Sequence, residues 1–218
     1  MKRTAVLLAL LVALGGCHGN LFRGKGLSGS GKAKTEKRVV AGFKAVNVSG
    51  AYEVEIAAQQ EPGLEIEGDD NLLPRVRTEV KDGVLNIYND EPISTSRPIR
   101  LRISAPQLDA VASSGASDIV VSNVKSDDFN VSTSGAGSLT ISGEAKKLAV
   151  EMSGAGELDA KDLRAERVSV NSSGAAEATV YASEDLSVSA SGAGTVNYYG
   201  DPKNVSENVS GGASISRK

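Results

Sequence analysis

Apolar and polar residues alternate along most of the chain, and the alternation restarts at regular intervals. In the segment FNVSTSGAGSLTI, Phe129 and Val131 precede a Ser-Gly-Ala step, and Leu139 and Ile141 follow its glycine-rich turn with the same two-residue spacing. This period places alternate side chains on opposite faces of a β-strand, so each unit predicts two strands with one buried face. Polar segments such as SNVKSDD and AKDLRAER separate the units, and we expect them to be return loops.

The Ser-Gly step recurs with a nearly constant spacing. From Gly115 onward each glycine follows the previous one after about 19 residues, which is a sustained repeat period. Such a period predicts an all-β fold, a β-solenoid of stacked coils resembling a right-handed β-helix. Glycine suits the corner because it adopts positive φ freely and lets neighbouring coils approach closely. The predicted corner glycines are Gly50, Gly115, Gly135, Gly154, Gly174, Gly192 and Gly211.

A single coil of a solenoid cannot bury its own apolar face, so each coil is stable only against its neighbours. We expect valines at the same place in successive units to form one internal ladder, with coils about 4.8 Å apart. Aromatic residues make up only 4% of the chain and Trp is absent, which fits a thin aliphatic core. The valines of this ladder are Val111, Val131, Val150, Val170 and Val188.

The repeat is blurred between Gly50 and Gly115, although segments such as YEVEIA and PIRLRIS still alternate like strands. Lys-Asp-Gly at residues 81–83 lies between two of these segments and predicts a hairpin turn. The segment NLLPRV is compatible with one helical turn. We expect a wider N-terminal part of the same body rather than a separate domain.

The first residues have the layout of a secretory signal. Lys2 and Arg3 precede an 11-residue apolar run, which is too short to span a bilayer, so residues 1–16 are predicted to be a signal peptide. The segment Leu-Gly-Gly-Cys ending at Cys17 resembles the lipobox of bacterial lipoproteins. That resemblance implies that Cys17 is lipidated, and His18, in place of aspartate, favours the outer membrane. Cys17 is the only cysteine of the chain, so it has no disulfide partner. The alternative to lipidation is a plain signal peptide with an unmodified thiol.

Residues 17–38 are rich in Gly, Ser and Lys, and we expect them to be a flexible, basic tether. The whole chain carries −3, of which residues 1–16 contribute +2 and residues 17–38 contribute +5, so residues 39–218 carry −10. A basic tether beside an anchor fits anionic lipid headgroups, and a solubilising linker is the alternative. The acidic body argues against nucleic acid as a partner.

Two nucleotide-binding patterns overlap in the tether, GKGLSG and GLSGSGKA, which ends at Ala33. A phosphate-binding loop requires Ser or Thr after its Lys, a strand before it and a helix after it. The sequence supplies none of these three features, so we expect no nucleotide and no other cofactor.

The body of the chain lacks the usual catalytic residues. His18 is the only histidine and lies in the tether, so Ser-His and Cys-His pairs are excluded from residues 39–218, and transition-metal sites are not expected. Carboxylates recur shortly after several Ser-Gly-Ala steps and would stack in one column. A calcium site, a glycosidase-like acid pair or a solvated acidic face are the possible interpretations, and we favour the solvated face. The column consists of Glu53, Asp118, Glu157 and Glu177.

Small residues at the corners form a second candidate surface. This ladder of Ser, Gly and Ala could receive a glycan or a partner strand, although a tight turn alone explains it. The last unit, NVSGGASISRK, shows no cap, and its strand edges could pair end to end with another copy unless Arg217 and Lys218 prevent it.

Three segments carry a family resemblance: FKAVNVSGAYEVEIA, DDNLLPRVRTEVKDGVLNIYN and PIRLRISAPQLDAVASSGAS. They resemble the head GIN domain of putative autotransporter-type adhesins, and the likeness covers residues 40–215 of a predicted domain at 39–218. The resemblance implies an exported bacterial β-solenoid of the pectin-lyase-like kind, with adhesion as the proposed role. We therefore expect a non-catalytic envelope module that binds a glycan or an envelope protein. A carboxylate-dependent enzyme acting on polysaccharide and a periplasmic stress regulator remain alternatives.

Overall fold

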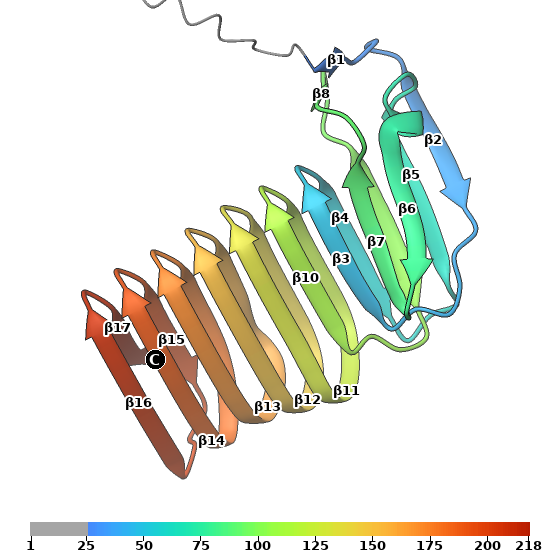
Figure 1. Cartoon of the computed structure of the whole chain (residues 1–218). Helices are drawn as coiled ribbons and strands as arrows, with labels where there is room; N and C mark the ends of the chain where they lie inside the picture. Colours follow the sequence, from blue (N-terminus) through green and yellow to red (C-terminus); the bar gives the residue numbers. More distant parts are fainter. Residues whose placement is uncertain (1–25) are drawn as a thin grey trace, which may run out of the picture.

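Parallel strands stacked coil upon coil form most of the molecule, and antiparallel strands widen its N-terminal end (Figure 1). The computed structural model describes residues 26–218. The predicted all-β solenoid is confirmed. Its strands are β1 (Leu27–Ser28), β2 (Ala33–Arg38), β3 (Ala45–Gly50), β4 (Glu53–Ala58), β5 (Gly63–Asp69), β6 (Val76–Lys81), β7 (Val84–Asn89), β8 (Ile93–Ser94), β9 (Arg100–Ala105), β10 (Ala110–Gly115), β11 (Asp118–Gly135), β12 (Ser138–Gly154), β13 (Glu157–Gly174), β14 (Glu177–Gly192), β15 (Thr195–Tyr199), β16 (Asn204–Gly211) and β17 (Ser214–Arg217).

Each central coil is one long strand that bends rather than two strands and a loop. Strands β11 to β14 run for 16 to 18 residues without interruption. The prediction of return loops at SNVKSDD and AKDLRAER is therefore wrong. In-register stacking gives the backbone of each bend hydrogen-bond partners on the next coil, so a polar bend can remain a strand. The bend is marked by a shift in pairing between Val121 and Val124.

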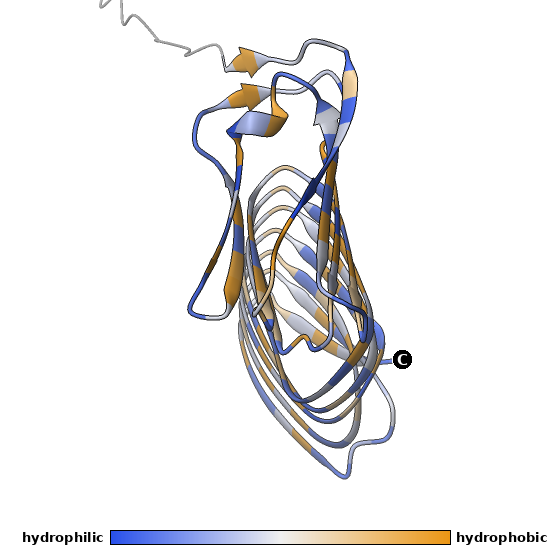
Figure 2. Cartoon of the chain, turned by 90° about the vertical axis from the view of Figure 1, so that its right-hand side faces the viewer, coloured by the Kyte–Doolittle hydropathy of each residue, from blue (hydrophilic) through white to orange (hydrophobic). Residues whose placement is uncertain are grey.

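The coils stack with equivalent residues in register, and they form nested loops when viewed along the axis (Figure 2). The predicted valine ladder is confirmed, because Val111, Val131, Val150, Val170 and Val188 pair in that order and all are buried. Full burial of one such side chain contributes about 1.5–3 kcal/mol. The ladder therefore makes each coil depend on the next one for its stability.

The valine ladder ends in a carboxylate. Val188 of β14 pairs with Glu207 of β16, so a charge occupies the place that valine holds in the preceding coils. The flanking Val205 and Val209 are 43% and 42% exposed. Any coil stacked on β16 would bury Glu207 without a counter-charge, and inward-pointing charges on edge strands oppose such pairing.

Glu207→Val is accordingly expected to increase self-association at least about tenfold, since burying an unpaired carboxylate costs several kcal/mol. Sedimentation velocity over a concentration series measures the change. Ser206→Val is the matched control, because the same strand gains an apolar side chain on its outer face. Equal association of the two variants would contradict a blocking role for Glu207.

The N-terminal part belongs to the same body, as expected. Strand β7 pairs in parallel with β3 and antiparallel with β6. The predicted hairpin turn is confirmed at Asp82 and Gly83, which have φ values of 51° and 76°. The predicted helical turn is also present, as a 3-10 turn over Leu73–Arg75.

The flexible tether predicted for residues 17–38 is wrong over residues 26–38. Strand β2 pairs antiparallel with β5 from Ala33 opposite Asp69 to Arg38 opposite Leu64. The segment AKTEKR has no apolar alternation, so its strand depends on the β5 edge that it covers rather than on its own pattern. The body thus includes residues 26–38 instead of only residues after 38. The predicted signal peptide, Cys17 and the first part of the tether lie outside the described residues.

Two charged side chains attach this N-terminal segment to the body. Arg38 donates hydrogen bonds from Nη1 to the carbonyl of Val76 (2.6 Å) and from Nη2 to the carbonyl of Leu73 (2.8 Å). Asp69, which is fully buried, accepts hydrogen bonds from the Gly31 amide (3.1 Å) and the Ser96 hydroxyl (2.7 Å). These contacts join β2 and the loop before it to β5, β6 and the 3-10 turn, all of which are distant in sequence.

The hydrogen bond from the Ser96 side chain holds the pKa of Asp69 below its ordinary value of 3.8, with further contributions from the Ser96 and Gly31 amides and Arg97. A carboxyl group with a lowered pKa in the folded state stabilises fully above its unfolded pKa, and this stabilisation is lost as pH falls through the folded pKa. We expect the free energy of unfolding to fall more steeply from about pH 4 to about pH 2 in the natural chain than in Asp69→Asn. Urea titrations of both proteins across this pH range measure the free energy of unfolding. Identical pH profiles of the two proteins would contradict a stabilising role for the Asp69 carboxylate.

Candidate functional site

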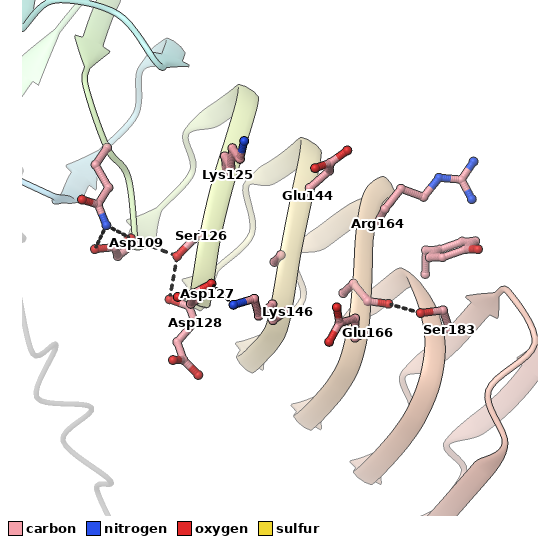
Figure 3. Close-up of a pocket in the computed structure, with 14 residues that line it drawn as sticks. Asp109, Lys125, Ser126, Asp127, Asp128, Glu144, Lys146, Arg164, Glu166 and Ser183 are labelled. Carbon is pink, nitrogen blue, oxygen red and sulfur yellow. Dashed lines mark hydrogen bonds and ion pairs between the residues drawn. The ribbon is translucent and has the colours of Figure 1, made fainter.

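The bends of successive coils form a long trough on one side of the solenoid (Figure 3). Its volume is about 750 Å³, and it extends from β11 across β12 and β13 to β14. Small residues line its floor, where Ser126, Ala145 and Ala165 stack in register. Because side chains alternate in direction along a strand, the exposed residues on either side of this row point outward as two walls.

Each wall is a column of charged residues drawn from equivalent positions of the coils. Along the first wall Lys125, Glu144 and Arg164 pair in register. The second wall, two residues further along each strand, consists of Asp127, Lys146 and Glu166, and Figure 3 shows the walls as two parallel rows. Charge therefore alternates along each wall and also across the trough, and we call these six residues the charge checkerboard.

The two walls differ in how far their charges are paired. On the second wall Lys146 lies 2.7 Å from a carboxylate oxygen of Asp127, and this hydrogen bond raises the pKa of Lys146 and lowers that of Asp127. On the first wall, none of the three residues has an ion pair or a side-chain hydrogen bond with another residue of the described part of the chain. All three charges of the first wall are therefore available to a ligand.

Arg164 is held in place by an aromatic ring. Its guanidinium carbon lies 4.2 Å from the centre of the half-buried Tyr181 ring. A cation over a ring face is attracted by the ring's electrons, and stacking restricts the guanidinium to one plane. The N–H groups of Arg164 consequently stay available at the edge of that plane.

The predicted acidic column lies elsewhere, just after the glycine corner. Glu53, Asp118, Glu157 and Glu177 occupy one ladder, in which Ser138 separates Asp118 from Glu157. Glu53 lies 2.7 Å from Arg100, Asp118 accepts a hydrogen bond from Ser138 (2.7 Å), and Glu177 accepts one from Asn197 (3.3 Å). Three of the four carboxylates thus have polar partners, and Asp118, Glu157 and Glu177 are exposed, which fits a solvated face better than a catalytic pair. Within residues 26–218, no three His, Cys, Asp or Glu side chains are grouped to hold a metal ion.

All seven predicted corner glycines fall on a single ladder, from Gly50 to Gly211. Every one has positive φ, between 76° and 146°. A Cβ atom added to Gly135 would lie 2.1 Å from the carbonyl oxygen of Gly115, and the other stacked corners are similarly close. Backbone strain and close stacking thus account for glycine at the corners without a ligand.

The trough itself was not predicted from the sequence. Its residues lie in the segments expected to be loops, where side-chain direction has no fixed period. A signal was nevertheless present, because Lys125, Glu144 and Arg164 recur at the same interval as the corner glycines.

Comparison with known proteins gives a consistent picture. The family described as putative auto-transporter adhesin, head GIN domain, matches residues 42–202. A putative adhesin from Bacteroides fragilis shares the fold with a TM-score of 0.70 and 21% identity, covering 88% of this chain and 100% of that one. A putative adhesin from Parabacteroides merdae has a TM-score of 0.57 at 19% identity, covering 89% of this chain and 99% of that one.

A third solved structure, a putative lipid binding protein from Parabacteroides distasonis, has a TM-score of 0.54 at 20% identity, covering 89% of this chain and 100% of that one. None of the curated proteins matches the chain. Residues 26–218 contain no helix that is long and apolar enough to cross a membrane.

Proposed function

The chain belongs to the family of putative auto-transporter adhesins with a head GIN domain, and from that premise we propose that it is a non-catalytic binding module of the bacterial cell envelope. The trough is the observation that carries this proposal. It crosses four coils, it is open along its length, and its first wall presents charges without partners in the described part of the chain. An extended ligand such as a glycan fits a surface of this shape.

Catalysis is the less favoured function for this site. Residues 26–218 contain neither His nor Cys, so His- or Cys-dependent nucleophile pairs cannot form there. The adjacent Glu157 and Glu177 are the remaining candidates for acid and base, and they lie in the acidic column rather than in the trough.

Attachment to the membrane through Cys17 completes the proposal. Eight residues separate Cys17 from Gly26, and an extended chain spans at most about 3.5 Å per residue, so the reach is roughly 30 Å. A lipid on Cys17 would keep the antiparallel N-terminal end close to the bilayer and leave the stacked coils pointing away from it. The lipobox and His18 favour the outer membrane as the place of this attachment.

A binding screen with the chain from His18 to Lys218 tests the proposed function. Glycans, envelope proteins and lipid vesicles are the probes, with a mass balance on every glycan. Saturable binding without cleavage is the expected result. Cleavage would overturn the non-catalytic assignment, and the absence of any binding partner would overturn the binding role itself. A chain beginning at Val39 is unsuitable, because it lacks β2 and Arg38.

A further inference from the structure

We propose that the trough recognises a zwitterionic group, one that carries an anion and an ammonium about one coil apart, as phosphoethanolamine does. The anion would bind Arg164 and the ammonium would bind Glu144. This inference rests on the proposed binding function and specifies the chemistry of the ligand. It is carried by the charge checkerboard and by the stacking of Arg164 on Tyr181.

Arg164 has the properties of a prepared anion site. Its guanidinium is fixed over the Tyr181 ring at 4.2 Å, and no carboxylate of the described residues lies within ion-pair distance of it. A guanidinium offers parallel N–H donors that match two oxygens of a phosphate or carboxylate. Because the ring already limits its motion, little conformational freedom is lost when an anion binds.

Glu144 is the complementary site on the next coil. It pairs in register with Arg164, so the two backbones are about 4.8 Å apart. Glu144 is exposed, and it makes no ion pair with another described residue. A carboxylate in this position accepts hydrogen bonds from an ammonium group whose anion occupies Arg164.

The neighbouring charges select against simple ions. Arg164 has Glu144 beside it on the first wall and Glu166 across the trough, so a lone anion would meet two like charges. Glu144 has Lys125, Arg164 and Lys146 around it, so a lone cation would be repelled in the same way. Only a ligand that carries both signs at the coil spacing satisfies both sites. Such recognition should also depend weakly on salt compared with the binding of a polyanion.

The experiment measures the binding of phosphoethanolamine, inorganic phosphate and ethanolamine to the chain from His18 to Lys218. The NMR signals of the Arg164 side chain report the binding of each compound. Phosphoethanolamine is expected to bind at least about tenfold more tightly than either half alone. The charge-neutral variant Glu144→Gln/Arg164→Gln should lose at least about tenfold in affinity. The matched control is Glu79→Gln/Lys81→Gln, which removes one charge of each sign from the exposed edge of β6.

Equal affinity for phosphate and phosphoethanolamine, or full binding by the trough variant, would overturn the proposal. Vesicles of phosphatidylethanolamine and a soluble glycan bearing phosphoethanolamine then separate the two sources of the group. Envelope binding that survives the trough variant would refute the zwitterion site and leave the binding module standing. Failure of every probe in both experiments would refute the binding module as well.

Discussion

Gly154→Val is expected to lower the free energy of unfolding by about 4 kcal/mol, which is large for a single substitution. Gly154 has a φ of 108°, where a β-branched residue is strained by about 1–3 kcal/mol. A Cβ atom there would lie 2.5 Å from the carbonyl oxygen of Gly135, so two coils must separate, which costs about 1–3 kcal/mol more. For a chain of this size, the melting temperature should fall by about 10 °C.

Gly42→Val separates the two causes. Gly42 also has positive φ, at 73°, but a Cβ atom there meets nothing within 4 Å. We expect this control to lose only the strain energy, about 1–2 kcal/mol. Calorimetry of both variants measures the difference, and equal losses would show that the corner glycines serve conformation alone and not the close stacking of the coils.

Removal of the N-terminal strand is expected to cause the second largest decrease in the free energy of unfolding. A chain beginning at Val39 loses β2 and with it the hydrogen bonds of Arg38 to Leu73 and Val76. Hydrogen bonds to a charged group contribute about 1.5–3 kcal/mol each, so we expect a loss of at least about 3 kcal/mol. Strand β5 would also expose an unpaired edge, which promotes aggregation.

The control for this truncation is a chain beginning at Lys25, which keeps β1 and β2 intact. Arg38→Met in the full chain isolates the part that depends on the guanidinium. Urea unfolding measures all three proteins. If the chain from Val39 is as stable as the chain from Lys25, the segment is a tether after all and β2 contributes nothing to the fold.

The repeat determined how much of the fold was predictable. Residues such as Val131 and Val150 carry the same alternation at the same spacing, so both the strands and their register followed from the sequence. The family resemblance rested on the same segments. The stacking partners of the corner glycines were predictable for the same reason, because a fixed period leaves one alignment of the coils.

Two features could not be predicted because their cause lies outside their own segment. Strand β2 has polar residues on both faces, and only the uncovered edge of β5 makes it a strand. The bends at Ser126 and Ala145 resemble loops in sequence, and only the backbone of the neighbouring coil makes them strands. The trough was missed for the same reason. The role proposed for Arg164 depends on Glu144 of one neighbouring coil and on Tyr181 of the other, and neither contact can be inferred from the segment around Arg164.

Alternation of charge also restricts how this protein can grow during evolution. Solenoids lengthen by duplication of a coil, and the valine and glycine ladders accept one extra copy without difficulty. The first wall does not, because a second copy of the coil that carries Glu144 would place two carboxylates side by side. Duplication of two adjacent coils preserves the order of signs. Longer relatives that keep this wall are therefore expected to differ from it by an even number of coils.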